Sequence, residues 1–293
     1  MKVSVVIPLY NARDVIRETI ESVLAQTWKE YDVIVVDDGS TDGSGAIVRE
    51  YGDRIRYLRQ ENGGVARARN RGVAESTGEY IALLDHDDLW HPAKLEKQVA
   101  VLDRRPEVGM VITDVAHLDR GGKPTGVIGA GYNPSETFAR LFVRGYVPTP
   151  SAAMIRRSVL QTVGGFDERF HSAGLDDHEL WTRIAAQYDI ANIAEPLTSH
   201  RNRDIKPADV ALAHRPLLIE TLLARFGEDP VRRRYLLREQ ASYLADQGKQ
   251  LVSMGERTRG RSCLVQGLAL GVMEARSWKT AWRCLSRLVR SYV

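Results

Sequence analysis

The chain has 293 residues, of which 43% are hydrophobic and 27% are charged, a composition typical of a globular protein that buries a substantial core. A formal net charge of +3 is too small to indicate nucleic-acid binding unless the cations cluster, so that class of partner is not expected. The two cysteines, Cys263 and Cys284, are far apart and predict neither a disulfide framework nor a zinc site.

The N-terminus is expected to be a first strand rather than a targeting segment. Its apolar run stops at Pro8, too early for the apolar region of a signal peptide. No apolar segment of the sequence approaches the ~20 residues that span a bilayer. The sequence therefore predicts a cytoplasmic protein, with a peripheral position at the inner face of the membrane as an alternative.

The first strand is predicted at residues 3–7 and a helix at 16–24, joined by Pro8, Leu9, Tyr10 and Asn11. This junction lacks the glycines with which a dinucleotide-binding turn approaches a pyrophosphate. Tyr10 could instead stack on a nucleotide base. Ordinary loop packing is the alternative.

A second strand, predicted at residues 31–36, ends in Asp37 and Asp38. The turn sequence GSTDGS follows and leads into a helix predicted at 45–51. One of the two aspartates is then left over. It could accept hydrogen bonds from a base or a ribose hydroxyl at the end of the strand.

A third strand is predicted at residues 55–58, followed by the loop ENGG and a helix with three alternating arginines. At 100° per residue these arginines spread over about 200°, so one or two can face a common site. Arg69, near the loop, is expected to meet a phosphate, because a guanidinium matches phosphate in a bidentate manner. A solvated helix face is the alternative for the whole run.

Three carboxylates, Asp85, Asp87 and Asp88, stop the apolar run at residues 80–84. Each close pair costs about 1 to 4 kcal/mol unless a cation neutralises it. Hard oxygen ligands of this kind predict Mg²⁺ or Mn²⁺ held together with a substrate's phosphates. For Asp88, a cap on the helix predicted at 93–103 is an equally good interpretation.

With a further strand at residues 108–113, the first half of the chain alternates between strands and helices, which predicts a doubly wound sheet. The pattern weakens at residues 121–150, where a loop-rich acceptor surface or lid is expected. Residues 152–155 are predicted to be a sheet-edge strand beside the site, and 190–194 the last strand.

A second acidic cluster, with Asp176 and Asp177, begins a helix that continues to Ile184. The helix dipole favours acids in the first turn of a helix, so capping is one interpretation of this cluster. The other is a general base that takes a proton from an acceptor hydroxyl. Further along, His200 could be a metal ligand or a phosphate contact, or a surface residue in a loop.

From Pro207 the strands disappear, and helical patterns follow at residues 208–226, 231–254 and 257–293. Their short apolar stripes predict helical hairpins, including a tetratricopeptide-like pair. Arginines outnumber acids here, so a basic amphipathic surface would suit anionic lipid or a partner protein. A solvated helical face is an equally good interpretation.

Five motifs occur in order: VSVVIPLYN, VVDDGSTDGS, ENGG with ARN, LLDHDD and GLDDHELWTRI. Together they resemble glycosyltransferase family 2, a family of inverting enzymes with the GT-A fold. The resemblance covers the chain to about residue 203. It implies an α/β fold of GT-A type, a Rossmann-like doubly wound mixed sheet, at residues 1–205. The tail lies outside the resemblance, and its own helical pattern predicts an α-helical extension at 206–293 that is tetratricopeptide-like or contacts a membrane or partner.

The resemblance also implies roles for the residues of the donor site. Those expected to hold the nucleotide are Pro8, Tyr10, Asp38, Arg69 and Asp85. Those expected at the cation are Asp87, with Asp85 and His200.

The family's ED motif, which carries its base, reads as Asp176 and Asp177 here. Asp177 is favoured because it occupies the position of the motif's own aspartate.

The predicted function is transfer of a sugar from a nucleoside-diphosphate sugar, with UDP favoured, to a saccharide, lipid-linked or other hydroxyl acceptor. Mn²⁺ or Mg²⁺ is the expected cofactor and bacterial cell-surface polysaccharide or glycoconjugate synthesis the expected pathway. A peripheral membrane contact or oligomerisation through the C-terminal helices is expected as well. The alternatives are a nucleotide-sugar-binding scaffold and a nucleotidyltransferase, although the latter would want a glycine-rich, lysine-bearing first loop that IPLYNARD does not supply.

Overall fold

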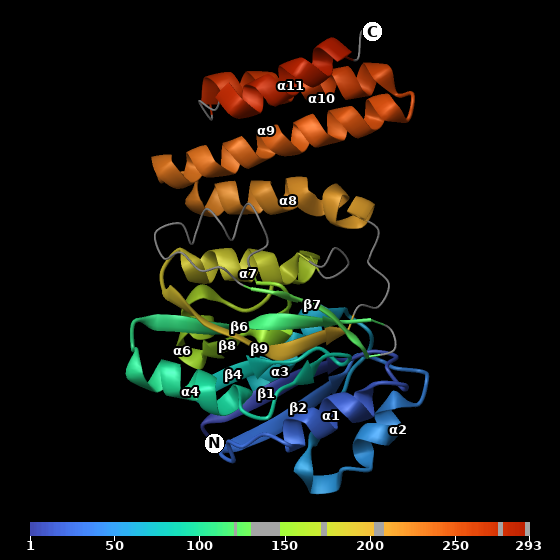
Figure 1. Cartoon of the computed structure of the whole chain (residues 1–293), viewed down its shortest axis with the longest axis vertical. Helices are drawn as coiled ribbons and strands as arrows, with labels where there is room; N and C mark the ends of the chain where they lie inside the picture. Colours follow the sequence, from blue (N-terminus) through green and yellow to red (C-terminus); the bar gives the residue numbers. More distant parts are fainter. Residues whose placement is uncertain (120–121, 130–146, 171–174, 202–207, 275–277, 291–293) are drawn as a thin grey trace. The chain divides into compact units, whose positions relative to one another are not determined.

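The computed structural model of the chain describes residues 1–119, 122–129, 147–170, 175–201, 208–274 and 278–290 (Figure 1). The chain divides into two compact units, Met1–Ala208 and Asp209–Val293. The first contains the sheet and the second is helical.

Strands and helices alternate in the first half of the sheet-containing unit. Its elements are β1 (Val3–Leu9), α1 (Ile16–Leu24), β2 (Tyr31–Asp37), α2 (Ser44–Arg49), β3 (Arg56–Arg59), α3 (Val65–Glu75), β4 (Tyr80–Leu83), β5 (Leu89–Trp90) and α4 (Lys94–Arg104). The second half adds β6 (Val108–Leu118), β7 (Pro124–Ile128), β8 (Met154–Arg156), α6 (Arg157–Val163), α7 (Asp176–Ala185) and β9 (Asp189–Arg201).

These strands form one mixed sheet in the order β3-β2-β1-β4-β8-β6-β9-β5, with β7 paired to β6. The strands β1, β2, β3 and β4 are parallel, whereas β8 is antiparallel to both of its neighbours. The predicted mixed, doubly wound sheet is therefore confirmed. Because β1, β2 and β4 run the same way, the residues that follow them gather at one edge, where ligands of such sheets bind.

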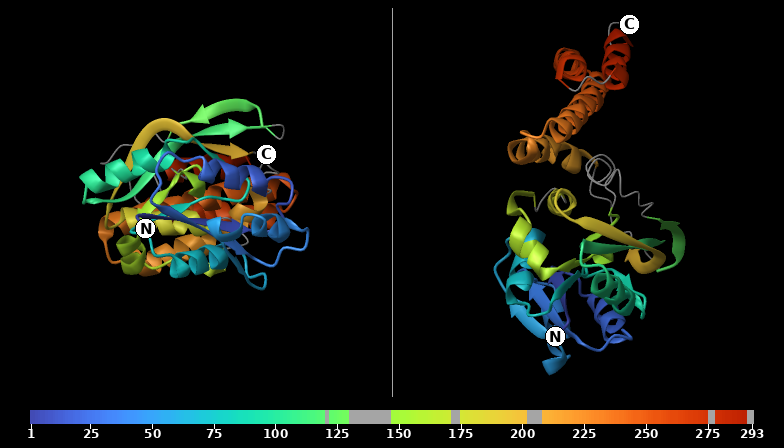
Figure 2. Two further views of the ribbon diagram at one scale, coloured as in Figure 1. Left: turned by 90° about the horizontal axis from the view of Figure 1, so that it is seen from below. Right: turned by 90° about the vertical axis from the view of Figure 1, so that its left-hand side faces the viewer.

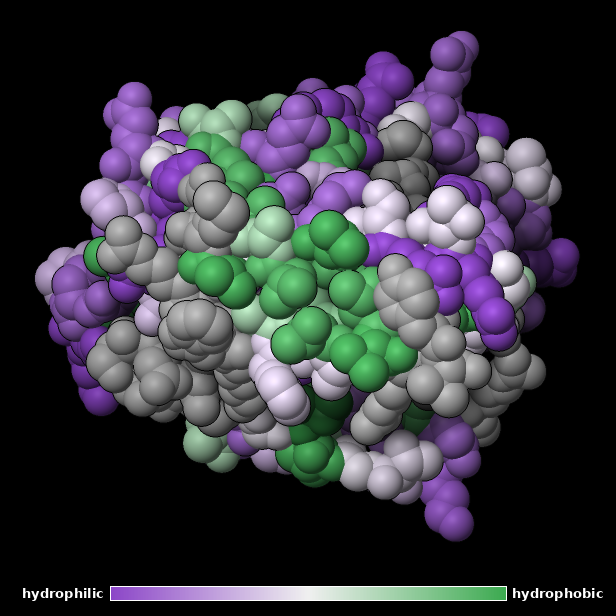
Figure 3. Space-filling view, turned by 90° about the horizontal axis from the view of Figure 1, so that it is seen from above, coloured by the Kyte–Doolittle hydropathy of each residue, from purple (hydrophilic) through white to green (hydrophobic). Residues whose placement is uncertain are grey.

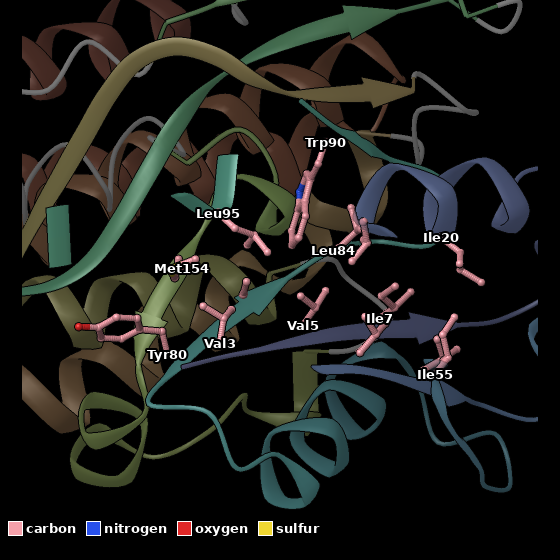
Figure 4. Packing of buried hydrophobic residues seen from close by; sticks show 14 of the residues in the cluster. Val3, Val5, Ile7, Ile20, Ile55, Tyr80, Leu84, Trp90, Leu95 and Met154 are labelled. Carbon is pink, nitrogen blue, oxygen red and sulfur yellow. The ribbon is translucent and has the colours of Figure 1, made fainter. Parts of the chain in front are cut away.

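Both faces of the sheet are covered, which explains the continuous apolar runs. In β1, Val3 and Val5 enter a cluster with residues of α1 and α4, while Val6 enters another with residues of α3, α6 and α7. Figure 4 shows Val3 and Val5 on the side of β1 where Trp90 and Leu95 lie.

Two local predictions are wrong. The segment predicted as an edge strand contributes β8, which lies inside the sheet between β4 and β6. Three residues are too few to show whether a strand is central or at an edge. His200 lies not in a loop but in β9, in register with His117 of β6. The polar sequence around it hides this strand, in which Thr198 is buried although it is polar.

Of the loop-rich segment predicted at residues 121–150, the structure shows β7 and the start of a 3₁₀ turn, Pro150–Ala152. Residue 121 and residues 130–146 lie outside the described residues. The acceptor surface or lid expected there stays a prediction.

The helical unit contains α8 (Ala208–Phe226), α9 (Pro230–Ser253), α10 (Arg257–Ala269), a π-helical turn (Leu270–Glu274) and α11 (Trp278–Arg290). The last three helices pack against one another (Figure 2). The prediction of one continuous helical segment at residues 257–293 is therefore wrong. The chain turns back so that α11 packs on α9 and α10, with Gly267 close to the Sγ of Cys284. Among the described residues, no helix is long and apolar enough to cross a membrane.

Candidate active site

A cavity of about 360 Å³ lies where β1 and β2 end and α3 begins. It is lined by Pro8, Leu9, Tyr10, Asp38, Asn62, Gly64, Val65, Ala68 and His86. The structure thus brings together three residues predicted to hold a nucleotide, Pro8, Tyr10 and Asp38. The backbone N–H of Asp38 donates to the carbonyl of Leu9 at 2.8 Å, which joins the ends of the two strands. The mainly apolar wall with few polar groups is typical of a pocket for a small ligand.

Asp38 holds the loop that forms one wall of this cavity. Its carboxylate accepts hydrogen bonds from the N–H groups of Gly63 and Gly64 at 2.9 and 2.8 Å and from the side-chain amide of Gln60 at 2.8 Å. Gly64 has a φ of +90°, a conformation that favours glycine, so the loop ENGG can wrap around the carboxylate. The local sequence therefore places a buried anion at the start of α3.

Asp37 has a different task from its neighbour. Its carboxylate accepts hydrogen bonds from the N–H of Ser40 at 2.7 Å and from the hydroxyl of Tyr57. Burial, together with this bond to an anion, raises the pKa of Tyr57 to about 12. The aspartate left over for the cavity is therefore Asp38, as the family resemblance implies.

The two acidic clusters of the sequence meet at Arg69. Its Nη1 donates to Asp176 Oδ2 and its Nη2 to Asp85 Oδ1, both at 2.6 Å. The guanidinium also lies 5.3 Å from the centroid of the Phe166 ring. Since Arg69 is only 4% exposed, it needs such anionic partners to remain buried. The candidate site is thus built from α3, the end of β4 and the start of α7.

The predicted contact between Arg69 and a phosphate stays a prediction. Both Nη atoms are engaged with carboxylates, and within the described part of the chain Nε is a buried donor without a hydrogen-bond partner. The residue is not part of the lining of the cavity. The geometry shows directly that Arg69 holds Asp85 and Asp176 in place.

Asp177 differs electrostatically from Asp176. Burial and the neighbouring charge of Asp176 raise the pKa of Asp177 from 3.8 to about 7, although Arg69 lowers it in part. Asp176 instead pairs directly with Arg69. A carboxyl group that titrates near neutrality can both accept and release a proton, as a general base requires. The raised pKa of Asp177 agrees with its choice as the base, which stays a prediction.

Sequence reasoning missed the pair that holds this helix in place. Glu179 and Arg183 form a buried bidentate ion pair with N–O distances of 2.6 and 2.8 Å. Arg183 also donates to the carbonyls of Val163 and Gly165, both at 2.6 Å. The spacing of four residues was a visible signal, but it reads equally well as an exposed helix pair.

The third acid of the cluster, Asp88, is not a helix cap. Helix α4 begins after Ala93 and has no side-chain cap. The fully buried carboxylate of Asp88 instead accepts from Thr149 Oγ1 at 3.0 Å and from the N–H of Arg201 at 3.2 Å, and lies 3.0 Å from His200 Nδ1. The sequence carries no signal for this role, because the partners are 61 to 113 positions away.

His200 meets the acidic cluster through this pairing. The hydrogen bond with Asp88 raises the pKa of His200, and the charges of Asp87 and Asp85 add to the effect. With Nδ1 held by Asp88, Nε2 is the nitrogen that could bind a ligand. A carboxylate that orients a histidine through its other nitrogen is common beside bound metals.

The acidic cluster fits a divalent cation only with help from a substrate. Among the described residues, no group of three or more His, Cys, Asp or Glu side chains is arranged to hold a metal ion. Asp85 is already paired with Arg69. One or two carboxylates together with substrate phosphates are, however, the usual shell of Mg²⁺. The donor chemistry therefore fits a cation that arrives with a diphosphate.

The family model described as Glycosyl transferase family 2 matches residues 4–164 of the chain. The chain belongs to glycosyltransferase family 2. The match begins in β1 and ends just after α6. It includes the cavity, Arg69 and the first acidic cluster.

Curated relatives agree with this assignment. The chain is 32% identical over 218 residues to an uncharacterised glycosyltransferase of Rickettsia typhi, an alignment that covers 72% of this chain and 67% of the relative. It is 46% identical over 108 residues to TuaG of Bacillus subtilis, a glycosyltransferase whose name assigns it to teichuronic acid biosynthesis. That alignment covers 35% of this chain and 42% of TuaG, so the chain spans less than half of that relative.

Solved structures confirm the predicted GT-A fold. The S. aureus TarS 1–349 structure in complex with UDP-GlcNAc is similar with a TM-score of 0.72 at 17% identity, covering 100% of this chain and 89% of the other. A mannosyltransferase of Pyrobaculum calidifontis, in complex with GDP-Man and Mn²⁺, is similar with a TM-score of 0.60 at 19% identity, covering 99% and 87%. At such identities the likeness concerns the fold.

Proposed function

We propose that the chain is an inverting glycosyltransferase that moves a sugar from a UDP-sugar to a hydroxyl acceptor. The observation that carries this proposal is the contact of Arg69 with both Asp85 and Asp176, which joins the two acidic clusters. The cavity at the start of α3 would take the nucleotide, with Tyr10 and Asp38 against the base. The UDP-GlcNAc bound by TarS supports the choice of UDP.

Asp177 would act as the base. Its carboxylate takes the proton of the acceptor hydroxyl while the oxygen attacks the anomeric carbon on the side opposite the diphosphate. The bond from that carbon to the diphosphate oxygen breaks, and its electron pair leaves with the diphosphate. A single displacement of this kind inverts the configuration at the sugar.

Negative charge develops on the departing diphosphate, and the chain must stabilise it. The residues that would hold Mn²⁺ or Mg²⁺ are Asp87, with Asp85 and His200. When bound, the cation would supply positive charge to the diphosphate oxygens. The Mn²⁺ in the Pyrobaculum mannosyltransferase supports this cofactor. Arg69 would keep Asp85 oriented and would hold down part of the rise in the pKa of Asp177.

The two units would divide the work. Residues 1–205 would form the nucleotide-sugar glycosyltransferase domain, and the helical extension from 206 to 293 would serve attachment. The teichuronic acid assignment of TuaG supports cell-surface polysaccharide synthesis as the pathway. If the acceptor is lipid-linked, it lies at a membrane, and a peripheral position at the inner face of the membrane would suit the enzyme.

A thermal-shift screen of UDP-, GDP- and TDP-sugars, with and without Mn²⁺, tests the donor site, because a ligand that binds the native state raises its melting temperature. We expect stabilisation by UDP-sugars that depends on Mn²⁺. Stabilisation by none of the three would overturn the donor site.

Two variants separate transfer from binding. Asp177→Ala should keep the Mn²⁺-dependent stabilisation and lose transfer, whereas Asp87→Ala should lose the dependence on Mn²⁺. Transfer by Asp177→Ala at the wild-type rate would exclude Asp177 as the base. Donor stabilisation of the unmodified chain, without transfer to any hydroxyl or hydrolysis, would indicate a scaffold.

A further inference from the structure

The helix α11 exposes an apolar stripe. Trp282, Leu285 and Val289 are 68%, 37% and 58% exposed, and their spacing of three and four residues puts them on one side of the helix. On the neighbouring side, about 100° around the helix, Ala281 and Cys284 are buried. The helix therefore has one apolar side that packs and another that faces outward.

The preceding segment also exposes apolar side chains. Val265 of α10 is 52% exposed and Val272 of the π-helical turn 37%. Both α10 and the turn pack beside α11. Figure 3 looks onto these elements and shows hydrophobic side chains gathered in one area of the surface. We call the surface made by Val265, Val272, Trp282, Leu285 and Val289 the α10–α11 face.

The positive charge of the chain is concentrated in the same elements. Residues 257–293 contain eight arginines and lysines against one acid, Glu274, whereas residues 209–256 contain seven cations and seven acids. The sheet-containing part, residues 1–208, is acidic, with 26 cations and 30 acids. The chain as a whole is nearly balanced, so the basic segment at its end is a local feature.

The described ion pairs of this segment are made with acids of α9 and of the residues just before α10. Arg283 and Arg287 both approach Asp246 of α9, at 3.2 and 2.6 Å, so one acid serves two cations. Glu256 pairs with Arg259. The contacts with Asp246 hold α11 against α9, and the segment that carries the exposed apolar side chains keeps its net positive charge.

We propose that the α10–α11 face docks on an anionic membrane surface. A helix with a cationic polar side and an apolar side carrying tryptophan lies in the interface of a bilayer, with its apolar side among the headgroups and its cations against anionic lipid. Two copies of the chain joined through this face would instead bring two positively charged segments together, which is unfavourable. The charge therefore favours an anionic lipid surface over a second copy.

Co-sedimentation of the full chain with vesicles tests this docking. Vesicles of phosphatidylglycerol and phosphatidylcholine should bind the chain, vesicles of phosphatidylcholine alone should not, and 0.5 M salt should weaken the binding because screening is strong at that concentration. Trp282→Glu should reduce the affinity for the anionic vesicles by roughly tenfold or more, since it removes the exposed ring and adds a repelled charge.

Met254→Glu is the matched control. Met254 is 66% exposed in the same unit but lies outside the α10–α11 face. Like Trp282→Glu, this variant replaces an exposed apolar side chain with a carboxylate, but it should bind the vesicles as the unmodified chain does. Circular dichroism checks that both variants fold.

No binding by the unmodified chain, or equal losses in the two variants, would overturn the proposal. Light scattering without vesicles gives a further test. If Trp282→Glu, and not Met254→Glu, changed the molecular mass of the particle in solution, the face would join copies of the chain and the proposal would be overturned. UDP-sugar stabilisation is measured separately, so the donor site and the docking face can fail independently.

Discussion

The two adjacent aspartates of this site, Asp176 and Asp177, differ in the electrostatic surroundings of their carboxylates. Asp176 is held by the guanidinium of Arg69 at 2.6 Å. Asp177 is half-buried without an ion pair of its own among the described contacts, and its pKa rises to about 7. One carboxylate therefore has a direct ion pair, and the charged form of the other is destabilised.

This difference predicts opposite effects of two matched substitutions. Asp176→Asn leaves the buried Arg69 with one carboxylate fewer and should lower the free energy of unfolding by about 3 kcal/mol or more, the scale for breaking a buried ion pair. Asp177→Asn removes the charge of a carboxylate whose ionised form is destabilised in the folded state. It should raise the free energy of unfolding at alkaline pH. Urea unfolding of both variants measures the difference.

The contribution of Asp177 to the free energy of unfolding depends on pH. The folded state keeps its proton up to about pH 7, while the unfolded carboxyl releases it near pH 4, so this group costs stability progressively as pH rises between these values. The gain from Asp177→Asn should therefore be larger at pH 8 than at pH 5. A gain independent of pH would show that the carboxyl does not titrate near 7.

The same titration should appear in catalysis. The base must be ionised, so kcat/KM for transfer should fall tenfold per pH unit below about 7 in the unmodified enzyme. Asp177→Asn should show little transfer at any pH.

At the scale of elements, the sequence predicts the helices α1 and α8 with their observed bounds. In α1 the buried residues Ile16, Ile20 and Val23 recur at helical spacing. It also predicts which strands end at the site, since Tyr10, Asp38 and Asp85 each follow a buried run. What it could not predict depends on distant partners. The role of Asp88 requires Thr149 and Arg201, and the place of β8 requires its two neighbours in the sheet.

The ENGG loop illustrates how one element couples stability to the cavity. Gly64 combines φ of +90° with ψ of 162°, a region that is essentially restricted to glycine. Its N–H also donates to Asp38. A side chain here would strain the backbone and pull the loop away from the carboxylate.

Gly64→Ala should therefore cost about 1–3 kcal/mol of stability and also raise the KM for the donor. Gly52→Ala is the control, because Gly52 has φ of +55° in open space, away from the cavity. It should cost about 1 kcal/mol and leave the KM unchanged. Equal changes of KM in both variants would show that the loop does not shape the donor site.

At the scale of the whole molecule, the chain consists of two units that differ in composition and in core. The core clusters around β1 contain only residues of the sheet-containing unit. The helical unit has its own close packing, in which Gly248 and Gly260 let α9 and α10 approach. Such an arrangement predicts two unfolding transitions rather than one.

The donor should act on one of these transitions only. UDP-sugar with Mn²⁺ at 100 times its Kd should stabilise the sheet-containing unit by about 2.7 kcal/mol and raise that transition alone. Gly248→Val should lower the other, because a Cβ at this position comes within 2.6 Å of Leu264 Cγ. Calorimetry of the full chain, with and without donor, measures both shifts. A single transition that responds to both the donor and Gly248→Val would mean that the two units unfold as one cooperative body.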